Sequence, residues 1–335
     1  MNLSIIIVNY NAKAYIIDCI KSASNFSSVK DFEWIIVDNN SNTSTKNEIQ
    51  NLFPFVKWID MNYNAGFARA NNAGIKAAKG DVILLLNPDT IVVDDCVNKC
   101  LELFLNDKAI ACSVQLRNLD NSPQITGNYF MIGGLNQLLP LPYLGKFLRA
   151  IAFFFKAKKT NITKANSREK VDWINGAFLM VKKAAIEKAG LLDEDFFLYA
   201  EESEWCYRLN KIGQLVVYGD LKITHLQGEI INSEANNYEK GYFNLVDKKG
   251  LQLIVSNNLR IRKQYGIGWF LFNVLMYVLE IPIFLICSFI DNLIHFKNPF
   301  KSWIDCYKYS KNILILISLS SAIILKKKRL FNVLN

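Results

Sequence analysis

The sequence predicts an α/β fold with a mostly parallel sheet, followed by apolar C-terminal helices. Short apolar runs recur along the first two thirds of the 335 residues, and helix-compatible segments separate them. Strands that alternate with helices favour a parallel sheet covered by helices on both faces. Residues 266–335 differ, because two long apolar stretches dominate them.

Each expected strand is a short run of apolar or alternating residues. The run at 82–86 is apolar throughout, which is typical of a fully buried strand. No G-x-G-x-x-G follows the first strand and no Walker A lysine occurs, so a nucleotide would be held in another way. The expected strands are 3–8, 33–37, 55–59, 82–86, 109–114, 214–218 and 222–225, and the expected helices are 12–24, 68–79, 94–105, 183–189, 202–211 and 238–263.

Residues 130–170 change character, because glycines and prolines interrupt them and a basic cluster follows. Four apolar residues, Ile151 and Phe153–Phe155, lie among these cations. Two interpretations stay open: a segment lying on an anionic lipid surface, and a mobile solvated loop. The basic residues are Lys146, Arg149, Lys156, Lys158, Lys159, Lys164, Arg168 and Lys170.

The C-terminal stretches suggest a membrane surface. Residues 267–290 are long enough to span a bilayer core, which takes about 20 residues. Residues 313–325 are too short, and the basic run Lys326–Arg329 follows them. Because Glu280 would be costly at the bilayer centre, we expect a hairpin lying on the cytoplasmic leaflet. A spanning pair is the alternative.

Composition agrees with an anionic partner. The net charge is +9, hydrophobic residues make up 51% of the chain and the mean hydropathy is +0.12. No zinc-finger spacing or RNP-like aromatic motif occurs, so nucleic acid is not expected as the partner. The seven cysteines are scattered, and two histidines do not complete a zinc set. We expect reduced, mostly buried thiols in a cytosolic protein without a secretory signal.

Two acidic motifs are candidates for chemistry. Asn87-Pro-Asp89 ends the buried strand at 82–86, and ligands of open α/β sheets bind beyond the carboxyl ends of strands. The second motif, Asp193–Arg208, interleaves carboxylates with aromatic residues, which can raise a carboxylate's pKa toward that of a general base. An acidic first helical turn is the structural alternative for the second motif.

The order of these motifs resembles glycosyltransferase family 2, and most closely its bacterial rhamnosyltransferase-like members. The resemblance covers about residues 3–226. It implies an inverting hexosyltransferase with a Rossmann-like GT-A fold. The matching segments are Ser4–Asn11, Val37–Ser41, Asn64–Gly74, Leu86–Thr90, Asp172–Ala177, Asp193–Arg208 and His225.

The resemblance also implies roles for individual residues. The base and ribose of a nucleotide would contact Tyr10 and Asp38, and the donor site would also include Asn40, Gly66, Arg69 and Asp89. A Mg²⁺ or Mn²⁺ ion would be held by Asp89 and His225. The sugar pocket would be shaped by Trp173 and Gly176. The general base would be Glu202, although the family's Glu-Asp pair is Glu201-Glu202 here and Glu201 stays a candidate.

The implied reaction moves a sugar from a nucleotide-diphosphate donor, dTDP-rhamnose or a UDP-sugar, to a saccharide acceptor. The acceptor is expected to be an oligosaccharide or lipid-linked, at the cytoplasmic face of the cell membrane. A processive synthase would carry a Gln-x-x-Arg-Trp motif, which is absent. A catalytically inactive nucleotide-sugar-binding membrane scaffold is the alternative, but it would be expected to lose Asp89 or the paired acids.

The expected domain organisation has three parts. Residues 1–229 form the catalytic domain, with 130–170 as a basic, aromatic loop on the acceptor side. Residues 230–265 form a connecting helix, and residues 266–335 a membrane-associated helical hairpin with a basic tail.

Overall fold

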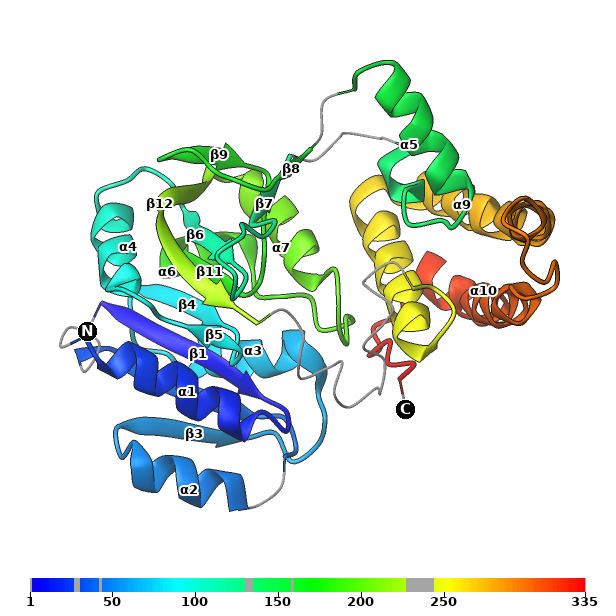
Figure 1. The fold of residues 1–335 in the computed structure, drawn as a ribbon. Helices are drawn as coiled ribbons and strands as arrows, with labels where there is room; N and C mark the ends of the chain where they lie inside the picture. Colours follow the sequence, from blue (N-terminus) through cyan, green and yellow to red (C-terminus); the bar gives the residue numbers. More distant parts are fainter. Residues whose placement is uncertain are drawn as a thin grey trace. The chain divides into compact units, whose positions relative to one another are not determined.

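The computed structural model describes residues 2–26, 31–41, 44–129, 135–157, 160–226 and 244–334, and they group into two units. The first unit contains the sheet, and the second contains the C-terminal helices together with residues 135–157 and 195–200 (Figure 1). The expected boundaries at 130 and 229 and the basic residues Lys158 and Lys159 lie outside the described residues.

The first unit is a helix-covered sheet. Its helices are α1 (Lys13–Ser24), α2 (Ser44–Leu52), α3 (Gly66–Ala77), α4 (Cys96–Leu105), α6 (Lys183–Ala189) and α7 (Glu201–Asn210). Its strands are β1 (Leu3–Asn9), β2 (Glu33–Asp38), β3 (Val56–Asp60), β4 (Val82–Leu86), β5 (Thr90–Ile91), β6 (Ala111–Arg117), β7 (Gly127–Asn128), β8 (Asn161–Ile162), β9 (Glu169–Val171), β10 (Trp173–Ile174), β11 (Phe178–Lys182) and β12 (Leu215–His225).

The main sheet has the strand order β3-β2-β1-β4-β11-β6-β12-β5. The pairs β3–β2, β2–β1, β1–β4 and β6–β12 are parallel, whereas β11 runs antiparallel to both of its neighbours. The carboxyl ends of β1, β2, β4 and β12 therefore meet at one edge, and β11 begins at that edge. This is the edge at which open α/β sheets bind ligands.

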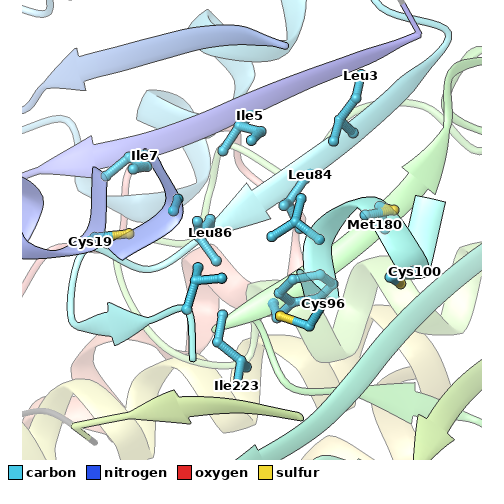
Figure 2. Close-up of a cluster of buried hydrophobic side chains, with 14 of the residues drawn as sticks. Leu3, Ile5, Ile7, Cys19, Leu84, Leu86, Cys96, Cys100, Met180 and Ile223 are labelled. Atoms are coloured by element: carbon cyan, nitrogen blue, oxygen red, sulfur yellow. The ribbon is translucent and has the colours of Figure 1, made fainter. Parts of the chain in front are cut away.

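Both faces of the sheet are buried, which explains the continuous apolar runs of its strands. One core cluster joins Leu84 and Leu86 of β4 to residues of α1, α2 and α4. The other joins Leu85 to residues of α3, α6 and α7. Figure 2 shows Leu84 and Leu86 among Ile5, Ile7 and Cys96 of the first cluster.

Two expected strands, 214–218 and 222–225, form the single strand β12. Its pairing with β6 shifts register between Tyr218 and Lys222. Gly219 lies at this irregularity, where its N–H donates to the Asn166 carbonyl at 3.0 Å. A Cβ at Gly219 would come within 2.3 Å of the Ala165 carbonyl oxygen, so the close approach requires glycine.

The second unit is helical. It contains the 3₁₀-helix η2 (Leu135–Leu138) and the α-helices α5 (Leu144–Phe154), α9 (Lys248–Ile294) and α10 (Trp303–Ile324). The expected helix at 238–263 and the apolar stretch at 267–290 are joined in α9, with a non-helical φ of 91° at Gly266. The start of the expected helix, up to residue 243, lies outside the described residues. Contacts of Tyr277 with Tyr309 and of Ile281 with Cys306 show that α9 and α10 form an antiparallel hairpin.

The basic, aromatic segment is helical in part, where we expected a loop. Its helix α5 places Leu144 and Leu148 on one face against the core of the second unit. The buried Glu280 of α9 accepts hydrogen bonds from the backbone N–H groups of Tyr143 and Leu144, at 2.6 and 3.0 Å. A carboxylate at a helix N-terminus satisfies donors that the helix leaves unpaired.

Glu280 thus lies inside the protein. The cost of placing its carboxylate in lipid therefore no longer argues against a membrane span. Of the helices that the structure describes, α9 alone has the length and apolar composition needed to cross a bilayer, and 28% of its most apolar window is buried within the protein.

Truncating the core of the first unit should reduce its stability. Leu84 is fully buried, so Leu84→Ala should lower the free energy of unfolding by about 2–5 kcal/mol, because it leaves a cavity. Leu103→Ala is the matched control, since Leu103 is 50% exposed on α4. Denaturant titration of the two variants should separate them clearly, and equal losses would contradict the assigned core.

Candidate active site

The carboxylate of Asp38 is fixed at the end of β2. Its Oδ1 accepts from the Asn9 side-chain amide at 2.6 Å, and its Oδ2 accepts from the Ser41 backbone N–H at 3.0 Å. Asn9 lies opposite Asp38 in the β1–β2 register. An ionised carboxylate has about four acceptor positions, so Asp38 can still accept from a ligand.

Hydrogen bonds also link the loops around Asp38. Tyr10 is 37% exposed directly after β1, and Asn40 has a φ of 73°, a left-handed conformation that asparagine tolerates. The Asn39 side chain donates to Asn64 at 2.8 Å and accepts from the Ala65 N–H at 2.7 Å. These bonds fix the start of α3, where Gly66 has a φ of 80°.

Asp89 and His225 lie side by side at the same edge. Antiparallel pairing of β5 with β12 sets His225 opposite Thr90. The Asp89 Oδ1 and the His225 Nε2 are 3.4 Å apart, and both side chains are largely buried. The Leu226 N–H also donates to the Asp89 carbonyl at 2.9 Å, so the backbone fixes this pair.

Gln124 determines which nitrogen of the His225 imidazole carries the proton. The amide of Gln124 donates to the His225 carbonyl at 2.7 Å and to the Asn118 Oδ1 at 2.6 Å. Its Oε1 therefore faces the His225 Nδ1, 2.9 Å away, and accepts from it. In the neutral imidazole this leaves a lone pair on Nε2, which lies 3.4 Å from both the Asp89 Oδ1 and the Asn87 side-chain amide nitrogen.

The pair fits a divalent cation in both donor type and spacing. Carboxylate oxygen suits Mg²⁺ and Mn²⁺, and imidazole nitrogen is a common metal ligand. Neighbouring ligands of one octahedral ion, each about 2.1 Å from it, lie about 3 Å apart. Among the described residues no group of three or more His, Cys, Asp or Glu could hold a metal, so further ligands would come from other groups.

The carboxylates of the acidic motif have separate surroundings. Glu204 pairs with Arg208 at 2.7 Å, and the Arg208 guanidinium also donates to the carbonyls of Ala189 and Leu191. The Trp205 indole N–H donates to the Gly190 carbonyl at 2.8 Å. Glu204, Trp205 and Arg208 therefore hold the turn after α6 and have a structural role.

Side chains of helix α3 form hydrogen bonds around the start of the acidic motif, at Leu192 and Glu194. Asn72 donates to the Leu192 carbonyl and accepts from the Leu192 N–H, at 2.9 and 3.0 Å. It also donates to the Glu194 carboxylate, and Arg69 donates to the Glu194 carbonyl at 3.0 Å. In this structure Arg69 thus positions the acidic motif.

The two adjacent glutamates differ in their environment. Glu201 is 4% exposed, and its Oε2 is buried without a hydrogen-bond partner among the described residues. Burial raises the pKa of the Glu201 carboxyl well above its ordinary value, and the charge of Glu202 raises it further. Glu202 is half-buried, and a Cβ at Gly176 would lie 3.7 Å from its side chain.

Gly176, a residue of the expected sugar pocket, lies beside the Glu202 side chain. It precedes β11 at the ligand-binding edge, and its missing Cβ leaves space beside Glu202 and Phe67. Trp173 lies in β10 of the small sheet, half-buried, and its indole N–H is buried without a partner among the described residues.

The first unit therefore contains every candidate site residue. The predicted pair Asp89 and His225 is adjacent, and Glu202 lies next to Gly176. The sequence did not single out the amides that fix these groups, because each joins segments distant in the chain. These amides are Asn9, Asn39, Asn64, Asn72 and Gln124.

Comparison with known proteins gives consistent matches. The family model described as Glycosyl transferase family 2 matches residues 4–173. The low-salt glycan biosynthesis hexosyltransferase Agl10 of Haloferax volcanii is 28% identical over 229 residues, which are 64% of this chain and 65% of that protein. Rhamnosyltransferase WbbL of Escherichia coli K12 is 26% identical over 223 residues, 64% of this chain and 79% of that protein.

A solved structure shares the fold. Mannosyltransferase PcManGT from Pyrobaculum calidifontis, in complex with GDP-Man and Mn²⁺, matches with a TM-score of 0.53 at 12% identity. The match covers 98% of this chain and 88% of that chain. The α/β fold with a mostly parallel sheet and GT-A-like architecture is thus confirmed.

The buried Glu201 should make stability depend on pH. A carboxyl whose folded pKa is raised contributes stability that is fully present below its ordinary pKa of 4.5 and is lost as pH rises through the folded value. Glu201→Gln removes this loss. Its melting temperature should therefore rise relative to wild type as pH increases above about 4.5. Thermal melts across pH check this.

The control is Glu187→Gln, at an exposed glutamate of α6. Its melting difference from wild type should not change with pH. A constant difference for Glu201→Gln as well would contradict the raised pKa.

Proposed function

The chain belongs to glycosyltransferase family 2, and from this we propose that it transfers a hexose from a nucleotide-diphosphate sugar to a saccharide acceptor, with inversion at the anomeric carbon. The observation that supports this best is the adjacency of Asp89 and His225 at the ligand-binding edge of the sheet. A pair of this kind suits a divalent cation that would bind the diphosphate of a donor, and Glu202 beside Gly176 supplies a second carboxylate for acid–base chemistry.

The proposed donor is dTDP-rhamnose or a UDP-sugar. The similarity to a rhamnosyltransferase supports the first, and Asp38 supports a nucleotide in general. The Asp38 carboxylate is held by Asn9 and Ser41 with acceptor positions remaining, which suits hydroxyl or N–H donors of a base or ribose.

The residues present support a direct displacement. Glu202 accepts the proton of an acceptor hydroxyl, and that oxygen forms a bond to the anomeric carbon from the side opposite the diphosphate. The bond from the anomeric carbon to the diphosphate oxygen breaks, and its electron pair leaves with the diphosphate. One displacement inverts the configuration, so no covalent enzyme intermediate is needed.

Asp89 and His225 would hold Mg²⁺ or Mn²⁺, which when bound neutralises charge on the departing diphosphate. Gln124 orients His225 for this role. The Mn²⁺ in the complex of the mannosyltransferase with the same fold agrees with the proposal.

Donor hydrolysis tests the proposed function directly. The purified protein would be incubated with dTDP-, UDP- and GDP-sugars plus Mn²⁺, and released nucleotide diphosphate measured with and without excess EDTA. We expect turnover of at least one dTDP- or UDP-sugar, lost in EDTA. Turnover of none of the donors, with no shift in melting temperature on donor binding, would contradict the proposal.

Glu202→Gln should retain donor binding and lose at least about 10²-fold in kcat, because the amide cannot accept the proton. Glu201→Gln is the matched comparison, since it changes the same atoms one position earlier. If Glu201→Gln is inactive and Glu202→Gln active, the base is Glu201. Steady-state kinetics and calorimetric donor binding distinguish these results.

The proposed acceptor is lipid-linked, which requires a membrane surface. The second unit exposes apolar side chains beside cations: Phe153, Phe154 and Phe155 at the end of α5 are 88%, 79% and 74% exposed. Lys146 and Arg149 lie on the same helix. Burying an aromatic side chain stabilises binding by about 1.5–3 kcal/mol, and each cation near an anionic surface by about 1 kcal/mol.

Vesicle flotation tests this surface. Replacing Phe153–Phe155 by serine should weaken binding to anionic phospholipid vesicles at least about tenfold, since each phenylalanine contributes apolar burial. The control replaces Leu52, Phe55 and Leu119, exposed apolar residues of the first unit, by serine. Equal binding by both triple variants would contradict a membrane-facing α5.

A further inference from the structure

The carboxyl end of β6 lies between the two parts of the candidate site. In the main sheet β6 lies between β11 and β12, antiparallel to β11 and parallel to β12. It therefore ends at the edge where Gly176 precedes β11 and where β12 ends in His225. Its last residue, Arg117, thus follows the sheet edge between Glu202, which lies beside Gly176, and the pair Asp89 and His225.

Contacts on both sides fix the backbone of Arg117. In the register of β6 with β12, Arg117 lies opposite Thr224, the residue before His225. On its other side it forms an antiparallel bridge with Pro123. The side-chain amide of Gln124, which donates to the His225 carbonyl at 2.7 Å, also donates to the Arg117 carbonyl at 3.4 Å. The backbone from which the Arg117 side chain extends is therefore fixed relative to His225.

Strand alternation gives the direction of this side chain. Leu116 and its register partner Ile223 both point into the first core cluster, which contains residues of α1 and α4. Successive side chains of a strand point to opposite faces, so Arg117 points to the face that α7 covers. Glu202 lies in the first turn of α7. Arg117 and the proposed general base are thus on the same face of the sheet.

The guanidinium of Arg117 has no hydrogen-bond or ion-pair partner among the described residues, although the residue is half-buried. Asp120, in the turn after β6, accepts hydrogen bonds from within that turn. Other cations that follow strands at this edge are engaged, because Lys13 and Lys46 pair with carboxylates and Arg69 donates to a backbone carbonyl. A half-buried guanidinium at a ligand-binding edge suits an anionic ligand with oxygen acceptors.

We propose that the Arg117 guanidinium binds a diphosphate group, the same group that a cation on Asp89 and His225 binds. This inference rests on the proposed function for the cation and for the donor as one source of the diphosphate. A planar guanidinium donates two parallel hydrogen bonds to phosphate oxygens. The leaving diphosphate gains negative charge as its bond to the sugar breaks, and the positive charge of Arg117 offsets it. A lipid-linked acceptor that carries a diphosphate is a second source of the same chemistry.

Titration calorimetry in the presence of Mn²⁺ tests this site. Arg117→Met removes the charge and keeps an unbranched side chain, so the affinity for dTDP and UDP should fall at least about tenfold, because charge-assisted hydrogen bonds are the strong ones. Arg117→Lys should lose less, since it keeps the charge without the planar fork. Binding of thymidine and uridine, measured by ligand-detected NMR, should stay the same in both variants, because a nucleoside has no phosphate.

The control is Lys108→Met, which removes a positive charge at an exposed position shortly before β6 begins. It should bind dTDP and UDP as wild type does. Decyl diphosphate, a soluble substitute for a lipid diphosphate, distinguishes the two sources. Weaker binding of dTDP and UDP alone by Arg117→Met assigns the site to the donor, and weaker binding of decyl diphosphate alone assigns it to the acceptor.

Wild-type affinity of Arg117→Met for dTDP, UDP and decyl diphosphate would overturn the inference, and the proposed function would stand if sugar transfer is found. An equal loss of nucleoside and diphosphate binding would also overturn it, because that result would show a general distortion of the site. If diphosphate binding depends on Arg117 but no sugar donor is turned over, the diphosphate site stands and only the proposed transfer is contradicted.

Discussion

The parallel pairing of β1 with β2 and β4 is the constraint on which the candidate site depends. It aligns three carboxyl ends at one edge, so that Asn9 can hold Asp38 and Asp89 can follow a fully buried strand. The same edge receives the end of β12, and the β5–β12 pairing sets His225 beside Asp89. Because helices cover both faces of the sheet, a register slip would disrupt the close packing of both core clusters, and this cost keeps the polar groups in place.

The acidic motif shows how one sequence segment supplies structural and functional carboxylates. Glu204 is neutralised by Arg208 and Asp195 by Lys263, and these ion pairs hold neighbouring backbone. Among the described residues Glu201 has no such partner for its Oε2, and it carries a raised pKa, whereas Glu202 lies beside Gly176. The stability lost by burying Glu201 is consistent with a site kept for chemistry, since perturbed carboxylates cluster at functional sites.

Local patterns were sufficient to predict the strands β1–β4, β6 and β12 and the helices α1, α3, α4, α6 and α7, but not α2, β11 or the short strands β5 and β7–β10. The apolar run at 82–86 has the same bounds as β4, and the helix at 183–189 the same as α6. Helix α5 was not predicted, because Glu280, which satisfies its N-terminus, lies 136 residues away from Leu144. The roles of Asn72 and Gln124 were equally hidden, since an asparagine or glutamine in a sequence gives no sign of a partner about 100 residues distant. Asp89 was a candidate from its place after a buried strand, whereas its pairing with His225 came from the family resemblance.

The position of the bound cation tests the central claim most directly. Crystals grown with Mn²⁺ and dTDP or UDP would be measured at the manganese absorption edge, and anomalous difference density would locate the ion. We expect one strong peak within coordination distance of the Asp89 carboxylate and the His225 Nε2, in contact with the diphosphate. A peak bound instead by carboxylates of the acidic motif, or a nucleotide bound away from Asp38 and Asp89 without a cation, would contradict the site described here.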